Sequence, residues 1–322
     1  MLTPRQNYLN YLNGDEYEWI PCSYDQKLFL PEIVPDNIAR GTVFQQKPFD
    51  RNRFGGYDWF GVHWTFDPAA AGMGGSMEDD ILFEDINDWE KYVKVPDLSK
   101  LDWEKSAEEN KEYITTDNIL STTIYTGFFE RLISFIGFSD ALVALVDEDY
   151  QDSVKAVFDK LADFYIELVG YFKKYYNLGM LDIHDDWGHQ RGALMSIETH
   201  REMIAPYLRK FTEGAKKLGV LVELHSCGKL ESLMPSLIET GVFTWRGQQE
   251  LNDKKKFVDQ YGDRFVYKVM VTEDFSDNRE VVQQKAADIY ELYKGKKIIL
   301  DYPRWLSPED SRILTEFARS HK

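Results

Sequence analysis

Short apolar runs alternate with longer amphipathic segments from residue 119 to residue 318. The clearest amphipathic segment carries an apolar stripe with helical spacing over residues 154–172. Strands that alternate with helices form parallel sheets, so the apolar runs predict parallel strands. Together with a strand near Trp19, these runs come closest to the strand number of a (β/α)8 TIM barrel, which we predict, and a doubly wound sheet is the alternative. The six runs cover residues 119–125, 180–184, 220–225, 242–245, 265–271 and 297–300.

The chain is less regular up to about residue 115. A short helix is predicted over residues 4–12, with Thr3 as its N-cap and Pro4 in its first turn. Residues 31–101 are rich in Gly, Pro, Asp and aromatic residues, which favours loops and small hairpins. The glycine-rich run 69–75 contains no GxGxxG motif, and no GxxxxGK[ST] motif occurs. We therefore expect one domain over residues 1–322, with an N-terminal elaboration (about 1–115) before regular β/α units (about 116–322).

Acidic residues dominate the charge of the chain. Lys and Arg number 38 against 55 Asp and Glu, which gives a formal net charge of −17. Such a charge repels nucleic acid and anionic membranes. The sequence has no apolar run of membrane-spanning length and no signal-peptide pattern, so we expect a soluble protein with no membrane partner. The two cysteines, Cys22 and Cys227, cannot build a disulfide framework and fit a reducing cytoplasm.

Polar residues follow the predicted strands, where a TIM barrel places its active site. His225 and Cys227 are two residues apart, so their side chains point the same way on a strand, with Cα atoms ~6.5–7 Å apart. Imidazole and thiolate are ligands that Zn²⁺ prefers. The pair therefore predicts a zinc site, against the alternative of a buried histidine beside a small apolar cysteine. The other polar residues at strand ends are Asp182, His184, Asp185, Asp186, Glu223, Arg246, Gln248, Gln249, Glu273, Asp274 and Asp301.

The third metal ligand is expected from another strand. Asp301 directly follows the last predicted strand and is the first choice. The alternatives are Asp185, Asp186 and Glu273. Glu223 lies four residues from Cys227, roughly 13 Å along an extended strand, so it does not easily join the same metal.

Acid–base and substrate-binding roles are expected from neighbouring residues. Asp185, Asp186 and Glu223 are the candidate proton donors, although Glu223 would also suit a buried ion pair with Arg or Lys. The candidates for substrate contacts are Trp64, Arg191 and Gln248. For Trp64 the alternative is core packing, and for Arg191 it is anchoring of its loop.

Several of these residues stand in motifs that resemble the uroporphyrinogen decarboxylase superfamily. The resemblance covers nearly the whole chain in order, and it implies a (β/α)8 barrel. The matching segments are Thr3-Pro4-Arg5-Gln6-Asn7-Tyr8, Thr126-Gly127-Phe128-Phe129-Glu130-Arg131-Leu132, Asp185-Asp186-Trp187-Gly188-His189-Gln190-Arg191-Gly192 and His225-Ser226-Cys227-Gly228-Lys229, with Pro235 downstream.

Within that superfamily the chain resembles the cobamide-dependent methyltransferase branch, which the His-x-Cys zinc motif marks. True decarboxylases carry an Arg-Gln-Ala-Gly-Arg segment near the N-terminus, and residues 22–53 contain nothing of that kind. Thiol-methylating members add a second cysteine after the last strand, where this chain has Asp301-Tyr302-Pro303. The resemblance thus implies zinc held by His225, Cys227 and an oxygen ligand such as Asp301.

The function that the resemblance implies is transfer of a methyl group between a small methylated substrate, such as a methyl ether, and a corrinoid carried on a partner protein. A decarboxylase of a small acid would instead depend on Arg191 or Arg246 and on no metal. A glycoside hydrolase would use two carboxylates such as Glu223 and Asp185, with no need of Cys227. A non-catalytic binding barrel would tolerate His225→Ala.

Overall fold

The computed structural model describes residues 1–67 and 81–322. The glycine-rich run 69–75 lies outside the described residues. The main sheet is parallel, and its strands follow one another in the order β1-β4-β5-β8-β9-β10-β11. This order has no reversal, which excludes a doubly wound sheet and fits an α/β barrel. Its strands are β1 (Gln26–Leu28), β4 (Ile119–Ile124), β5 (Met180–His184), β8 (Leu221–His225), β9 (Thr244–Arg246), β10 (Val266–Met270) and β11 (Ile298–Asp301).

The sheet has seven strands in the described residues, not the eight that were predicted. Six of these strands overlap the six predicted apolar runs, and the segment after Trp19 supplies the seventh, which follows a turn at Ser23–Asp25. Before the turn, Cys22 forms a parallel bridge with Leu300 of β11, and Leu300 N–H donates to the Pro21 carbonyl at 3.1 Å. After the turn, β1 pairs with β4. One short segment thus joins both edges of the sheet.

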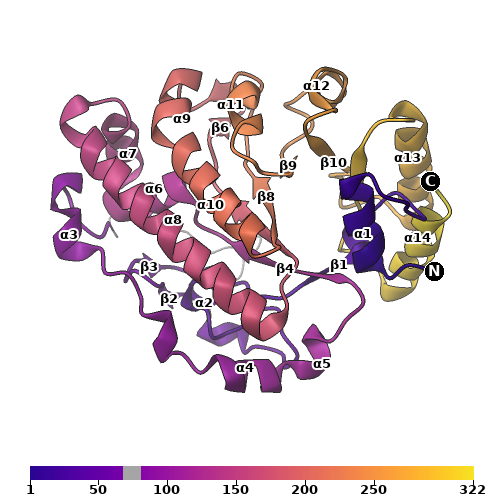
Figure 1. The fold of residues 1–322 in the computed structure, drawn as a ribbon, viewed down its shortest axis with the longest axis horizontal. Coiled ribbons are helices and arrows are strands. Elements are labelled where there is room, and N and C mark those ends of the chain that lie inside the picture. The colour runs from indigo at the N-terminus through magenta and orange to yellow at the C-terminus, as the bar shows by residue number, and fades with distance from the viewer. Residues whose placement is uncertain (68–80) are drawn as a thin grey trace.

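Helices cover the outside of the sheet (Figure 1). The long helix α8 and helix α10 pack side by side, and α8 buries the apolar stripe that its sequence predicted. Asp147 caps α8, and Asn177 ends it in a left-handed conformation. The helices after β4 are α6 (Phe128–Ile136), α7 (Phe138–Ala144), α8 (Glu148–Tyr176), α9 (Ile197–Met203), α10 (Ala205–Lys217), α11 (Met234–Ile238), α12 (Lys254–Tyr261), α13 (Arg279–Leu292) and α14 (Pro308–Arg319).

Helix α1 (Pro4–Asn13) packs against strand residues at the N-terminal end of the barrel. Thr3 caps it as predicted, in a capping box with Gln6. Tyr8 and Tyr11 pack there in one cluster with Ile119, Met180 and Ile299. The Tyr11 hydroxyl donates to the Ile298 carbonyl at 2.7 Å and accepts from the Ile298 N–H at 2.8 Å. The helix therefore holds β11 by its backbone as well as by apolar contact.

The irregular segment between β1 and β4 packs on α6 and α8. Arg131 of α6 is fully buried and forms ion pairs with Asp36 and Asp58 of this segment. Trp64 donates its indole N–H to the same Asp58 at 2.8 Å. This segment contains α2 (Pro35–Ala39), the hairpin of β2 (Gly56–Tyr57) and β3 (His63–Trp64), α3 (Trp89–Tyr92), α4 (Trp103–Glu109) and α5 (Lys111–Ile114). A second hairpin pairs β6 (Gly188–His189) with β7 (Gly192–Ala193).

Candidate functional site

The register of the parallel strands brings polar side chains into rows across the barrel. His184 of β5 is paired with His225 of β8, and His225 is paired with Arg246 of β9. The imidazole rings of His184 and His225 stack with centroids 4.3 Å apart. Two residues earlier, Asp182 is paired with Glu223. Since alternate residues of a strand share a face, both rows belong to the same face of the sheet.

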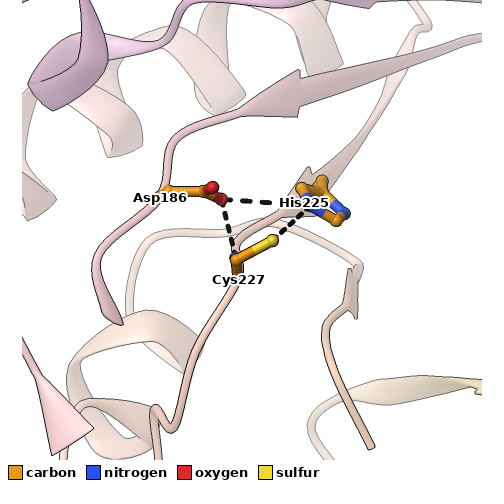
Figure 2. A group of neighbouring side chains, drawn as sticks. All are labelled: Asp186, His225 and Cys227. Carbon is orange, nitrogen blue, oxygen red and sulfur yellow. Dashed lines mark hydrogen bonds and ion pairs between the residues drawn. The ribbon is translucent and has the colours of Figure 1, made fainter. Parts of the chain in front are cut away.

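Asp186, His225 and Cys227 form a compact donor group at the ends of β5 and β8 (Figure 2). One ligand atom from each residue lies within 4.8 Å of the other two. His225 Nε2 is 3.3 Å from Cys227 Sγ and 3.9 Å from Asp186 Oδ1. The Cys227 N–H donates to Asp186 Oδ1 at 2.7 Å, which fixes the carboxylate beside the thiol.

A tight turn directs Cys227 toward His225. Gly228 has φ +86°, and a Cβ on it would lie 2.2 Å from the carbonyl carbon of Gly188. Only glycine combines this left-handed conformation with such a close approach to a neighbouring backbone. The Gly228 N–H donates to Gln248 Oε1 at 2.9 Å. Gln248, predicted as a substrate contact, thus supports the turn that carries the cysteine.

The surroundings favour neutral forms of both soft donors. Burial, with the positive charges of nearby groups, lowers the pKa of His225 well below its usual range, so its imidazole stays neutral. Burial and the adjacent Asp186 carboxylate raise the pKa of Cys227 to about 12, so the thiol needs a cation nearby to ionise. The donor set of one nitrogen, one sulfur and one oxygen fits Zn²⁺. His225 Nδ1 is buried with no hydrogen-bond partner in the described residues.

Asp186 supplies the oxygen of this group, and Asp301 does not belong to it in the described part of the chain. Asp301 ends β11, across the barrel from β5 and β8. Although burial opposes it, the charges of Lys268 and Arg246 lower the pKa of Asp301. The position of Asp301 at a strand end predicted that it would face the site. Which carboxylate reaches Cys227 depends on the order of the strands, and β5, which carries Asp186, is the neighbour of β8.

The structure gives two of the predicted proton donors other partners. Asp185 is buried and accepts hydrogen bonds from the N–H groups of Phe128, Phe129 and Glu130, at 2.8–3.2 Å. It therefore anchors the first turn of α6. Glu223 pairs through both carboxylate oxygens with Lys268 Nζ, at 2.9 and 3.0 Å. Of the three predicted donors, Asp186 alone lies in the donor group.

The remaining substrate-binding predictions fall away from the donor group. Trp64 is buried against Asp58, and the Arg40 guanidinium lies 4.2 Å above its ring. Arg191 is exposed beside the β6–β7 hairpin, where its N–H donates to His189 Nδ1. Trp64 thus packs in the core, whereas the Arg191 contact is made by its backbone, so the role of the Arg191 side chain stays a prediction.

Glu130 and Lys268 line this region and were not predicted. Burial raises the pKa of Glu130 well above its usual range, and the negative charges of Asp186 and Asp185 raise it further. Glu130 Oε2 is buried with no hydrogen-bond partner in residues 1–67 and 81–322. The signals in the sequence were a lysine inside the apolar run of β10 and a glutamate in the first turn of the helix that follows β4.

A cavity of about 230 Å³ lies inside the barrel next to His184. Its charged lining consists of Asp182, Glu223, Arg246, Lys268 and Arg304. Arg246 Nη2 donates to Asp182 Oδ2 at 2.8 Å and lies 3.4 Å from His184 Nε2. A polar interior departs from the layers of branched apolar side chains that fill most TIM barrels.

The chain is similar in structure to a methyltransferase from Methanosarcina mazei, with a TM-score of 0.67 and 14% identity over 99% of both chains. This similarity shows a shared fold along the whole length. A sugar phosphate isomerase/epimerase from Parabacteroides distasonis is more distant, with a TM-score of 0.37 and 7% identity over 71% of this chain and 83% of that chain. No protein-family model and no curated protein matches the sequence. None of the helices in the described residues is long and apolar enough to cross a membrane.

Proposed function

We propose that this protein is a methyltransferase that moves a methyl group between a small methylated substrate and the corrinoid of a partner protein, with zinc at Asp186, His225 and Cys227. The observation that carries the proposal is the convergence of these three donors at the C-terminal ends of β5 and β8. The fold shared with a methyltransferase from Methanosarcina mazei supports it. The resemblance of the His225–Cys227 motif to the cobamide-dependent branch supports the corrinoid partner.

Breaking the bond to the methyl group is the difficult step, because an alkoxide or amide is a poor leaving group. In the proposed demethylation, the Co(I) corrinoid of the partner protein would supply the electron pair that takes the methyl group, and the electron pair of the broken methyl–heteroatom bond would stay on the heteroatom. Zinc bound at this site would supply Lewis acidity to that heteroatom. The chain must then supply one proton to the leaving group.

Glu130 is the acid placed for that proton transfer, since Asp186 is a zinc ligand in this proposal. Asp185 and Glu223 are committed to α6 and to Lys268. Glu130 has a buried oxygen with no hydrogen-bond partner in the described residues, and burial raises its pKa although the nearby Arg40 lowers it. A protonated carboxyl group beside the reacting heteroatom can act as a general acid.

Elemental analysis of the purified protein tests the metal site. We expect about one zinc per chain in the wild type, its loss in Cys227→Ala, and at least tenfold weaker zinc binding in Asp186→Ala. Cys22→Ala is the matched control, since Cys22 is a buried cysteine outside the donor group. A wild type without zinc, or with equal zinc in Cys227→Ala, would contradict the proposed site.

Methyl transfer is then measured by the absorbance change of reduced cobalamin in the presence of methyl ethers. The proposal expects methylcobalamin to form with the zinc-loaded wild type and to fall at least a hundredfold with Cys227→Ala. Zinc binding without methyl transfer from any donor would reject the activity and leave the metal site standing.

A further inference from the structure

The cavity beside the donor group has an unusual balance of charges. Lys268 and Glu223 neutralise each other, since both carboxylate oxygens lie within 3.0 Å of the ammonium group. Asp182 accepts one hydrogen bond from Arg246 Nη2, and Arg246 Nε lies 3.9 Å from Glu223 Oε1, an ion pair without a hydrogen bond. Arg246 Nε is buried with no hydrogen-bond partner in the described residues. The cavity therefore contains a guanidinium that its protein neighbours do not saturate.

Arg304 adds a second guanidinium to the lining. It is exposed and forms no ion pair with any residue that the structure describes. The five charged side chains of the lining thus carry one net positive charge. Behind the lining, Asp301 and Glu273 are negative and Lys254 is positive, and they interact electrostatically with one another and with the lining groups. In a chain with a net charge of −17, two guanidinium groups on the lining of one cavity, with Arg304 free of ion pairs among the described residues, point to an anionic ligand.

The chemistry of the two arginines restricts the class of anion that can bind in the cavity. A guanidinium presents its N–H groups in a planar fork, which matches a carboxylate in two parallel hydrogen bonds. The cavity volume of about 230 Å³ is below the ~300–1,000 Å³ of drug-sized ligand pockets, so the ligand is small. The lining also includes Leu28, Tyr125 and Met180, which can contact a short carbon skeleton.

The cavity and the donor group are separated by a single imidazole ring. Arg246 Nη2 is 3.4 Å from His184 Nε2, and the His184 ring stacks on that of His225 at 4.3 Å. The cavity lining does not include Asp186, His225 or Cys227, so a ligand held at the arginines would reach these donors past the His184 ring.

We propose that the methylated substrate is a small carboxylic acid, held by Arg246 and Arg304 with its methyl-bearing atom toward Asp186, His225 and Cys227. This inference rests on the proposed methyl-transfer function for the identity of the methyl group. The carboxylate subsite is inferred from the residues that line the cavity and does not depend on the proposed activity. Arg246 and Arg304 are positioning residues in this scheme, and neither takes part in bond breaking.

Calorimetric binding to the zinc-loaded protein tests the subsite. The probes are methoxyacetate, 3-methoxypropionate and 4-methoxybenzoate, each compared with its uncharged amide. We expect at least one acid to bind at least tenfold more tightly than its amide. Arg304→Gln should remove that preference, and Arg304→Lys should restore part of it.

Arg264→Gln is the matched control. Arg264 is also an exposed arginine, but it precedes β10 at the opposite end of the barrel and contacts the Tyr261 ring. This variant should keep the preference for acids over amides. Equal binding of every acid and its amide, or an unchanged preference in Arg304→Gln, would overturn the inference.

The measurements separate this inference from the proposed function. Zinc content should be the same in Arg304→Gln and the wild type, because Arg304 is not one of the three donors. Tight acid binding that depends on Arg304, without methyl transfer to cobalamin, would reject the methyltransferase and keep the carboxylate subsite. If neutral ethers donate methyl groups equally well to the wild type and to Arg304→Gln, the methyltransferase would be supported and the carboxylate subsite rejected.

Discussion

Asp185 and Asp186 are adjacent in the chain and have opposite roles. The Asp185 carboxylate turns inward and holds three backbone N–H groups of α6. The Asp186 carboxylate remains partly exposed, beside His225 and Cys227. The pattern of two carboxylates after a strand could predict a site, but not which of the two would face it. That choice depends on where the first turn of α6 lies, which no local pattern encodes.

The buried Lys254 gives a prediction for the pH dependence of the unfolding free energy. It is buried, its Nζ donates to the Lys268 carbonyl at 3.1 Å, and burial lowers its pKa to about 8. An unfolded lysine has a pKa of ~10.4, so between pH 8 and pH 10 the native state releases its proton first. The wild type should therefore gain roughly 2 kcal/mol of unfolding free energy relative to Lys254→Met between pH 7 and pH 10.

Urea unfolding at pH 7, 8, 9 and 10 measures this difference. Lys255→Met is the control, because Lys255 is exposed and pairs with Asp259 on the surface of α12. Its difference from the wild type should not show the same rise. If the difference in unfolding free energy between the wild type and Lys254→Met does not change with pH either, burial does not lower the pKa of Lys254.

Among the elements, the strands of the second part of the chain were predicted most closely. Strand β5 has the predicted bounds, and β4, β8, β10 and β11 lie within one residue of them at each end. These strands are buried on both faces, so their sequences are continuous apolar runs bounded by turn residues. The short helices between β1 and β4 were not predicted, because buried contacts such as those of Arg131 with Asp36 and Asp58 join residues far apart in sequence.

The turn after β8 can be tested by adding one methyl group. Gly228→Ala should destabilise the protein by about 1–3 kcal/mol, because the added Cβ meets the backbone of Gly188 and His189 in a left-handed conformation. Zinc affinity should fall at least tenfold, since Cys227 is displaced with the turn. Gly192→Ala should change neither quantity, because a Cβ there meets no atom within 4 Å. Unfolding curves and zinc titrations of both variants give the comparison.

For the whole molecule, the sequence predicted a parallel α/β barrel and the polar ends of its strands. It predicted the His225–Cys227 pair because both residues belong to one strand end, where spacing determines direction. Asp301 and Asp186 were equally placed after strands, and only the order of strands around the barrel separates them. Lys268 lies inside β10 and Arg304 follows β11, so these two cavity charges have no common pattern in the sequence.

Closure of the barrel gives a prediction for the whole molecule. Tyr11→Phe removes the hydroxyl that both donates to and accepts from Ile298 of β11. Two buried backbone groups lose that partner, so the unfolding free energy should fall by roughly 1–3 kcal/mol. Tyr17→Phe should change it by less than ~0.5 kcal/mol, because Tyr17 packs on Tyr11 by its ring and its hydroxyl forms no hydrogen bond in the described residues. Equal effects in urea unfolding would show that β11 does not depend on this contact.

The bridge between Cys22 and Leu300 joins residues from opposite ends of the chain, so it can form only after β11 has been synthesised. The ribosome releases the segment around Cys22 long before it makes β11, so the emerging chain cannot complete its ring. Until then, one edge of the growing sheet has unpaired backbone groups, which can attract strands of other chains. We therefore expect this edge of the nascent sheet to stay exposed until β11 has been synthesised.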